Sequence, residues 1–259
     1  MIFRLQAEYC DSRSPLYAAL CRRFAVDPRV AAIASDLRWD FPLRLLGGMH
    51  FLVLGGEGSW DAVDQMLEER AGFLARFVAE QPVQTNEVGR ARTLVRGLEA
   101  VGRERIDLLE LGTSAGLLLY PDRYYDVPFK IVRRRGIDTH PIDVTTDEGA
   151  RLLEAFVWPD QTERIERLRA AIAIVREDPP ELITGDYVDL VSELVDKDTV
   201  VMTCVTTVYL EDERYAELVE KLRGVTWLSL EMPRDAAGYD GMRLTLDGRV
   251  LAEHVDFHA

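Results

Sequence analysis

The segment whose residue types and spacing most clearly indicate a functional site runs from Glu110 to Gly116 and reads Glu-Leu-Gly-Thr-Ser-Ala-Gly. An apolar run ends at Glu110, and small residues carry the backbone to Gly116 before apolar residues resume. This order predicts a strand, a tight turn and a helix. Glycine lets a ligand approach the backbone, and a following helix offers free N–H groups and a positive dipole end. The segment is therefore a candidate ligand site.

The spacing of the glycines separates the ligands that use such a turn. A dinucleotide turn needs Gly-x-Gly-x-x-Gly, but Ser114 and Leu117 occupy the second and third glycine positions. No Gly-Lys-Ser/Thr follows, so a phosphate loop is not indicated. The remaining pattern, Glu-x-Gly-x-x-x-Gly, is expected of enzymes that bind S-adenosylmethionine, a ligand without phosphate. The predicted cofactor contacts in this segment are Glu110, Gly112, Thr113, Ser114 and Gly116.

The same letters also spell Gly-x-Ser-x-Gly, the nucleophile elbow of serine hydrolases. In that alternative Ser114 is the nucleophile, and a downstream Asp and His254 complete the chain order. The helical character of the residues before the turn weakens it, because an α/β-hydrolase normally places several strands before its elbow. A third interpretation is a turn whose glycines serve packing alone.

A polar cluster precedes the helix predicted from about Glu87 to Val101. Thr85 or Asn86 is a natural N-cap for this helix, since a short side-chain oxygen accepts a bond from a first-turn N–H. Arg90 lies one turn further on the same face as Asn86 and Glu87, where the three could hold a carboxylate or an amino group. A structural network and a ligand contact both remain open for this cluster.

Further candidates lie at or near the ends of later strands. Asp138 ends the second predicted strand, where an acid typically receives ribose hydroxyls. Asp186, followed by Tyr187, ends a short third strand and can meet an adenine amino group, with capping of the next helix as the equal alternative. Thr203 lies in the β-branched run from 199 to 209, which predicts a central strand.

Methyl transfer from a sulfonium needs a base only when the nucleophile must lose a proton. His50 lies among apolar residues, where desolvation depresses the imidazole pKa and keeps the ring neutral. The alternative is a hydrogen-bonded core histidine. Glu87, Tyr209 and His254 are weaker candidates for the base. His254 and His258 lack a third ligand, so no metal site is predicted.

The elements that position these residues fall into two regions. Residues 1–101 follow helical periodicity and are predicted to form a lid and a substrate wall. Residues 102–259 alternate strands with helices, carry a helical insertion at 145–178 and end in a hairpin at Asp247-Gly248. The fold predicted is α/β: a Rossmann-like methyltransferase core, with a mostly parallel sheet and a terminal antiparallel hairpin, plus an all-helical N-terminal region.

Composition excludes several classes of protein. Hydrophobic residues make up 47% of the 259 residues, which suffices for a substantial core. The net charge of −14 argues against non-specific nucleic-acid binding.

Three cysteines without a Cys-x-x-Cys motif fit reduced thiols in a cytoplasm. The chain starts without a signal-peptide pattern, and its longest apolar run is too short for a bilayer, so neither secretion nor membrane insertion is expected. The oligomeric state is not indicated.

Several motifs occur in one order along the chain: Ser14-Pro15-Leu16-Tyr17, Gly48-Met49-His50-Phe51, Gln84 to Arg90, Glu110 to Leu117, Asp122-Arg123-Tyr124, Gly136-Ile137-Asp138 with Pro141 and Asp143, Val157 to Gln161, and Gly185-Asp186. Through them the chain resembles a bacterial domain-of-unknown-function family with a methyltransferase-like core. The resemblance implies that the Glu110 to Gly116 turn contacts the cofactor and that Asp138 and Asp186 hold its ribose and adenine. Two departures are Thr203-Cys204, where similar proteins often show a histidine and a small residue, and a short loop after Asp126.

The function expected from the sequence is therefore S-adenosylmethionine-dependent methyl transfer to a small molecule or a peptide. The alternatives are a serine hydrolase that uses Ser114 and a non-enzymatic protein that binds a nucleoside or S-adenosylmethionine.

Overall fold

The computed structural model describes residues 1–33, 38–84, 87–234 and 240–256. Asn86, one of the predicted cofactor contacts, lies outside these ranges, as does the alternative cap Thr85. The chain forms two compact units. One unit combines Met1–Thr85 with Thr146–Arg169, and the other combines Asn86–Thr145 with Ala170–Ala259.

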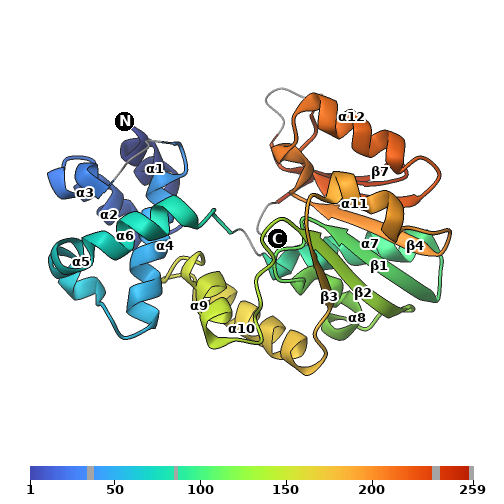
Figure 1. Cartoon of the computed structure of the whole chain (residues 1–259), viewed down its shortest axis with the longest axis horizontal. Helices are drawn as coiled ribbons and strands as arrows, with labels where there is room; N and C mark the ends of the chain where they lie inside the picture. The colour runs from blue at the N-terminus through green and yellow to red at the C-terminus, as the bar shows by residue number, and fades with distance from the viewer. Residues whose placement is uncertain (34–37, 85–86, 235–239, 257–259) are drawn as a thin grey trace. The chain divides into compact units, whose positions relative to one another are not determined.

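The first unit packs helices around an apolar core (Figure 1). Ser14 begins one of them as its side chain accepts a hydrogen bond from the Tyr17 N–H, and Pro15 takes the first helical position. The helical elements that lie in this unit or begin in it are α1 (Ile2–Cys10), α2 (Pro15–Phe24), α3 (Pro28–Ile33), α4 (Phe41–Leu54), η1 (Trp60–Ala62), α5 (Val63–Glu69), α6 (Ala71–Glu80), α9 (Asp147–Ala155) and α10 (Thr162–Glu177). None of the helices in the described ranges is long and apolar enough to cross a membrane.

The second unit is built on a mostly parallel sheet, which confirms the predicted fold class. Over the described residues the strand order is β3-β2-β1-β4-β5-β6-β7. The strands are β1 (Arg105–Leu111), β2 (Lys130–Asp138), β3 (Glu181–Thr184), β4 (Thr199–Cys204), β5 (Thr226–Glu231), β6 (Met242–Leu246) and β7 (Arg249–Val255). The first five pair in parallel, and β6 and β7 form the predicted antiparallel hairpin. Its turn residues Asp247 and Gly248 both have positive φ, as an Asp-Gly hairpin turn requires.

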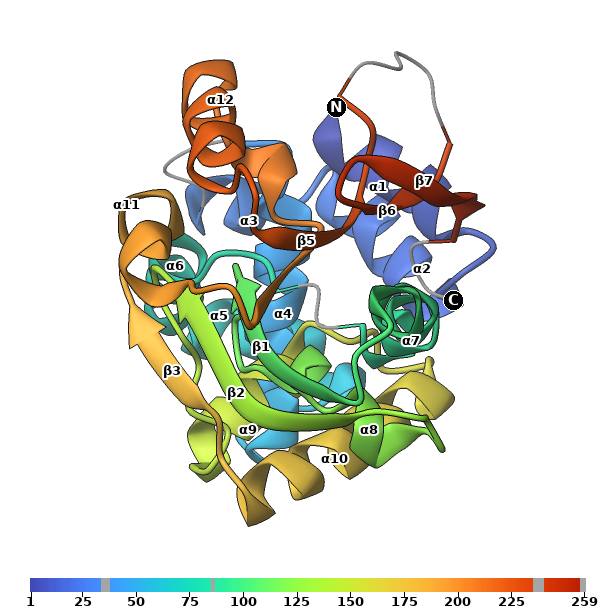
Figure 2. The same cartoon turned by 90° about the vertical axis from the view of Figure 1, so that its right-hand side faces the viewer.

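Helices cover both faces of this sheet. Figure 2 shows α11 (Tyr187–Leu194) and α12 (Asp212–Lys221) on one side, and α7 (Ala91–Val101) and α8 (Pro121–Tyr124) on the other. Leu109 and Leu111 of β1 pack into the core under α11 and α12. Because side chains alternate along a strand, Glu110 between them faces the side of α7.

Two features differ from the sequence predictions. The glycine turn does not enter a long helix but the short 3₁₀ turn η3 (Leu117–Leu119) and the four-residue helix α8. Pro121 begins a new helix and cannot continue one, which explains the break. In addition, α7 groups with the sheet unit rather than with the helices that precede it, and the insertion divides at residue 169. Gly97 explains the close packing of α7, since a Cβ there would lie 2.2 Å from a Leu228 methyl carbon.

Candidate functional site

Four residues capable of chemistry gather at the carboxyl ends of the parallel strands. Glu110 and Asp138 lie at the ends of β1 and β2, and Cys204 and Glu231 are the last residues of β4 and β5. β1 and β4 are neighbours in the sheet, but the chain continues from β1 to β2 on one side and from β4 to β5 on the other side. In open α/β sheets, ligands bind outside the carboxyl ends of the strands at such a switch point. This edge is therefore the candidate site.

The glycine turn follows β1 at this edge and has a strained backbone. Gly112, Ser114 and Gly116 have φ values of +72°, +52° and +73°. The N–H of Gly112 donates to the Ile137 carbonyl at 2.8 Å, which fixes the turn to the end of β2. A Cβ on Gly112 would lie only 1.9 Å from the Thr206 hydroxyl oxygen. Glycine is thus required at this position by conformation and by space.

Asp138 connects β2 to the glycine turn. One carboxylate oxygen accepts the Ser114 N–H at 2.8 Å, and the other accepts the His140 N–H at 2.9 Å. Each oxygen keeps a further lone pair, and the side chain is half-buried rather than enclosed. The carboxylate is therefore held in position and can still accept hydrogen bonds from ligand hydroxyls.

Glu110 is a buried acid at the same edge. Its side chain is 3% exposed and accepts a hydrogen bond from the Thr113 hydroxyl at 2.7 Å. Burial, helped by the Asp138 charge and opposed by Thr113 and Arg90, raises the pKa of Glu110 to about 8. Glu110 therefore keeps its proton at neutral pH unless a cation joins it.

Arg90 supplies the positive charge within this cluster. Its guanidinium, buried at the end of η2 (Val88–Arg90), lowers the pKa values of Glu110 and Glu231 and hydrogen-bonds Cys204. Burial nevertheless raises the pKa of Cys204 to about 12, so this residue stays a thiol.

Glu231 holds the turn that follows β4, and the sequence interpretation missed it. Its carboxylate oxygens accept the Thr206 N–H at 3.1 Å, and one of them accepts the Thr207 N–H at 3.2 Å. Val205 within this turn has a φ of +53°, a strained value for a β-branched residue. Burial raises the pKa of Glu231 to about 7, against the lowering effect of these hydrogen bonds. An acid at a strand end, the signal that marked Asp138, could also have identified Glu231.

Several other predicted cofactor contacts form structural bonds. Asp186 caps α11 through the Val188 N–H at 2.8 Å and pairs with Arg214, which matches the capping alternative. The Tyr187 hydroxyl donates to the Thr206 carbonyl at 3.4 Å, and burial raises its pKa to about 12. Thr203 accepts the Trp227 indole N–H at 3.1 Å and belongs to the face under α11 and α12.

The three predicted catalytic groups have different structural surroundings. Glu87 is buried and caps η2 by accepting the Gly89 N–H at 3.0 Å. Tyr209 ends η4 (Thr207–Tyr209), on the segment after β4, and is 69% exposed. His50 belongs to the helical unit, where its Nδ1 lies 3.3 Å from the Ala155 carbonyl and burial lowers its pKa. These contacts are those of a hydrogen-bonded core histidine.

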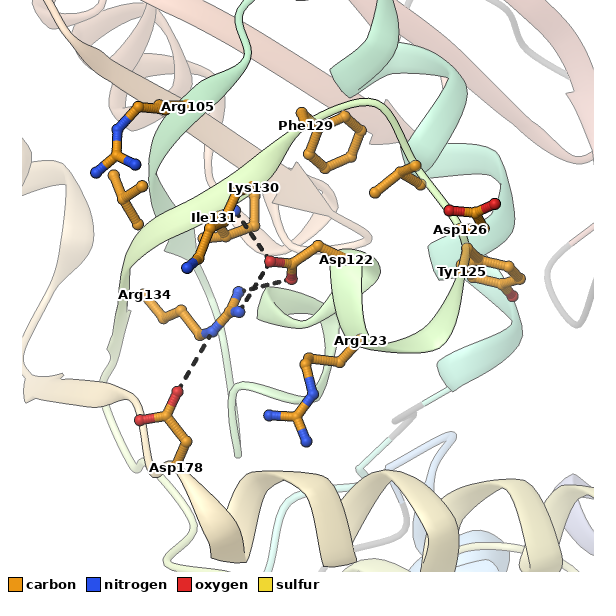
Figure 3. A pocket seen from close by; sticks show the side chains of 12 residues that line it. Arg105, Asp122, Arg123, Tyr125, Asp126, Phe129, Lys130, Ile131, Arg134 and Asp178 are labelled. Atoms are coloured by element: carbon orange, nitrogen blue, oxygen red, sulfur yellow. Dashed lines mark hydrogen bonds and ion pairs between the residues drawn. The ribbon is translucent and has the colours of Figure 1, made fainter.

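Two cavities of the sheet unit lie near the ends of β1 and β2. The smaller, about 300 Å³, lies beside the glycine turn and is lined by Ala115, by the loop after β2 and by Pro180. The larger, about 650 Å³, lies at the amino-terminal ends of β1 and β2 (Figure 3). The acids and the glycine turn meet at the carboxyl ends of the strands, beside the smaller cavity.

Glu110→Gln is expected to flatten the dependence of stability on pH. The folded protein holds a proton on Glu110 up to pH about 8, whereas the unfolded chain releases it near 4.5, the ordinary pKa of a glutamic acid. The contribution of Glu110 to stability is therefore largest at low pH and falls as the pH rises between these values. Thermal unfolding from pH 5 to 8.5 measures this slope. The control variant Glu99→Gln, at an exposed position, should show the same dependence of stability on pH as the parent protein. If Glu110→Gln also showed the parent's slope, the raised pKa assigned to Glu110 would be wrong.

The strand order defines a Rossmann-like α/β protein, and the acids at the carboxyl ends of its strands mark a candidate ligand site at the switch point. The chain belongs to the bacterial family described as "Uncharacterized protein conserved in bacteria (DUF2332)", whose sequence model matches residues 1–128 and 125–255. No curated protein gives a significant match.

Two solved structures similar to the chain are methyltransferases. Magnesium protoporphyrin IX methyltransferase from Synechocystis PCC 6803, with bound SAM, is 12% identical and has a TM-score of 0.36, with 57% of this chain and 59% of that chain covered. The methyltransferase domain of bacterial CtHen1 is 15% identical and has a TM-score of 0.31, with 57% and 66% covered. The chain thus matches less than two thirds of the length of either structure.

Proposed function

We propose that the protein transfers a methyl group from S-adenosylmethionine to a small molecule or a peptide. One observation carries the proposal: the glycine turn enters the three-residue η3 instead of a long helix and lies beside the carboxyl groups of Glu110 and Asp138. A dinucleotide places its pyrophosphate on a helix N-terminus, and the Asp138 carboxylate beside this turn would repel it. A phosphate-free cofactor with a positive sulfonium suits this edge better.

The residues of the edge fit such a cofactor, which supplies an activated methyl group when bound. Asp138 is positioned to accept ribose hydroxyls. Backbone groups of residues 112–116 would hold the amino-acid end. Arg90 sets the charge of Glu110 and Glu231, whose buried carboxyls favour a positive ligand once ionised. The chain's part is therefore to orient the cofactor and to balance its charge.

Tyr209 is the predicted catalytic group that this proposal retains. It follows the strained turn after β4, and its side chain is exposed. An acceptor that must lose a proton would meet a hydroxyl there. His50 and Glu87 are engaged in core and capping bonds, so we assign them no proton transfer.

The position of His254 argues against the serine-hydrolase alternative, in which this residue would be the general base. His254 lies on β7, which is four strand spacings from β1. At about 4.8 Å per spacing, this is roughly 19 Å from the strand that leads to Ser114. The imidazole instead lies 3.1 Å from the Asp240 carbonyl. Labelling of Ser114 by a fluorophosphonate would revive the hydrolase interpretation.

Calorimetric titration with S-adenosylmethionine and S-adenosylhomocysteine tests the proposal, and micromolar dissociation constants are expected. Asp138→Ala should weaken binding by about 1–3 kcal/mol, the loss of hydrogen bonds to a charged group. Asp198→Ala, an exposed acid in the turn before β4, is the matched control and should bind as the parent does. Circular dichroism checks the fold of each variant.

The outcomes separate the remaining interpretations. Absence of binding would exclude both the methyltransferase and the nucleoside-binding protein. Equal affinity in Asp138→Ala would move the ribose contact elsewhere. Tight binding without turnover on panels of small-molecule and peptide acceptors would favour the binding protein.

A further inference from the structure

The larger cavity lies at the amino-terminal ends of β1 and β2 (Figure 3), whereas the glycine turn follows the carboxyl end of β1. Its lining includes Arg105 and Lys130, the first residues of β1 and β2. β1 has seven residues, so its two ends are roughly 20 Å apart at about 3.3 Å per residue. With about 650 Å³, the cavity has the size of a small-molecule site. It is therefore separate from the proposed cofactor edge.

Two cations that line this cavity are neighbours across the β1–β2 pairing. Arg105 and Lys130 are register partners in the β1–β2 pairing, and both are exposed. Within the described ranges neither has an ion-pair partner. Like charges opposite each other destabilise a sheet. A ligand that supplies negative charge would relieve this repulsion.

The other basic residues of β2 all have carboxylate partners. Each of its three arginines has a carboxylate within ion-pair distance: Arg133 with Glu181 at 2.9 Å, Arg134 with Asp122 at 3.0 Å and Arg135 with Asp107 at 2.9 Å. The whole chain has 45 acidic and 31 basic residues, so acids are plentiful. The two cations at the strand starts are the exception on this pair of strands.

The floor of the cavity is held by an ion pair and hydrogen bonds. The side chains of Asp122 and Arg134 are 8% and 10% exposed and form an ion pair. Arg134 also donates to the Leu119 carbonyl at 2.7 Å, and Asp122 accepts the Ile131 N–H at 3.0 Å. Figure 3 shows Arg134 between Asp122 and Asp178, whose carboxylate lies 3.9 Å from the Arg134 Nε. These contacts hold the floor in place, and Arg134 offsets the charge of Asp122.

Aromatic side chains complete the wall. Phe129 and Tyr125 line the cavity, and Tyr125 and Asp126 lie on the side of Asp122 away from Arg105 in Figure 3. Arg123 is neutralised by Glu177 at 2.7 Å. The cationic end and the aromatic wall together suit an organic anion better than a bare ion.

We propose that this cavity binds a small organic phosphate, with its phosphate on Arg105 and Lys130. A guanidinium fork and an ammonium point charge are the two side-chain groups that proteins use most for phosphate. The ring or apolar part of the ligand would contact Phe129 and Tyr125. The proposal is independent of the methyltransferase assignment.

Calorimetry with phenyl phosphate, inorganic phosphate and phenol tests the proposal at low salt. Phenyl phosphate should bind with a submillimolar dissociation constant, about tenfold more tightly than inorganic phosphate, and phenol should not bind. The double variant Arg105→Gln/Lys130→Gln should weaken this binding by about tenfold or more. Arg249→Gln, which removes an exposed cation at the start of β7, should leave it unchanged.

Fold and site are checked separately. The double variant should keep or raise the melting temperature, because it removes the repulsion between register partners. Phenyl phosphate affinity that is equal in parent and double variant would overturn the proposal, as would no saturation up to about 10 mM. Inorganic phosphate binding as tightly as phenyl phosphate would overturn the organic-ligand part. Unchanged S-adenosylhomocysteine affinity in the double variant would support two separate sites.

Discussion

Gly112→Ala is expected to lower the free energy of unfolding of the sheet unit by about 2–5 kcal/mol. The φ of +72° alone costs a Cβ about 1–2 kcal/mol. The Cβ would also lie 1.9 Å from the Thr206 hydroxyl oxygen and 2.6 Å from the Thr206 Cβ, which overpacks the site by about 1–3 kcal/mol more. Native-state hydrogen exchange of β1 and β4 amides measures the loss in this unit by itself.

Gly102→Ala is a matched control for this prediction. Gly102 ends α7 with the same φ of +72°, but a Cβ there would meet nothing within 4 Å. It should therefore show the backbone cost alone, about 1–2 kcal/mol. Adding Thr206→Gly to Gly112→Ala should recover the steric part. An equal loss in the Gly102 and Gly112 variants would show that the turn after β4 does not press on the glycine turn.

The strands and the hairpin could be predicted because their signals are local. β4 follows from a run of β-branched residues, and the hairpin follows from Asp247-Gly248 between alternating apolar residues. The segment after the glycine turn carries no such signal. Apolar residues 117–119 fit a helix or a tight turn equally well, and Pro121 fits the end of one helix as well as the first turn of the next.

The site was predicted only in part because its contacts are long-range. Asp138 could be found from its place after a strand and a glycine turn. Glu231 has the same signal, but its role depends on Thr206, which lies 25 residues earlier. Thr203 and Cys204 differ by one position and therefore face opposite sides of the sheet. Sequence alone does not show which of the two sides carries Arg90.

Glu231→Ala is expected to destabilise the sheet unit by about 3–5 kcal/mol, the usual cost of breaking a buried charge network. The N–H groups of Thr206 and Thr207 lose their carboxylate acceptor, and each unsatisfied buried group costs about 1–3 kcal/mol. Arg90 also loses a compensating charge. Denaturant unfolding followed by amide exchange in β4 and β5 measures the effect.

Two variants bracket this prediction. Glu231→Gln keeps one carbonyl acceptor and should lose about half as much. Glu253→Ala removes an exposed acid that pairs with Arg243 at 3.1 Å on the hairpin, and such a pair contributes at most about 1 kcal/mol. If Glu231→Ala lowered the free energy of unfolding as little as Glu253→Ala does, the Glu231 carboxylate would not hold the turn after β4.

Coupling to Gly112 decides whether Glu231 acts on the glycine turn. Glu231 fixes the backbone of Thr206, and the Thr206 side chain fills the space above Gly112. If the turn relaxes without its carboxylate, alanine at position 112 should cost less in the Glu231→Ala background, by about 1 kcal/mol or more. Additive losses would mean that the two turns are held independently. In that case, a change at Glu231 would reach the cofactor edge only through the charge of Arg90.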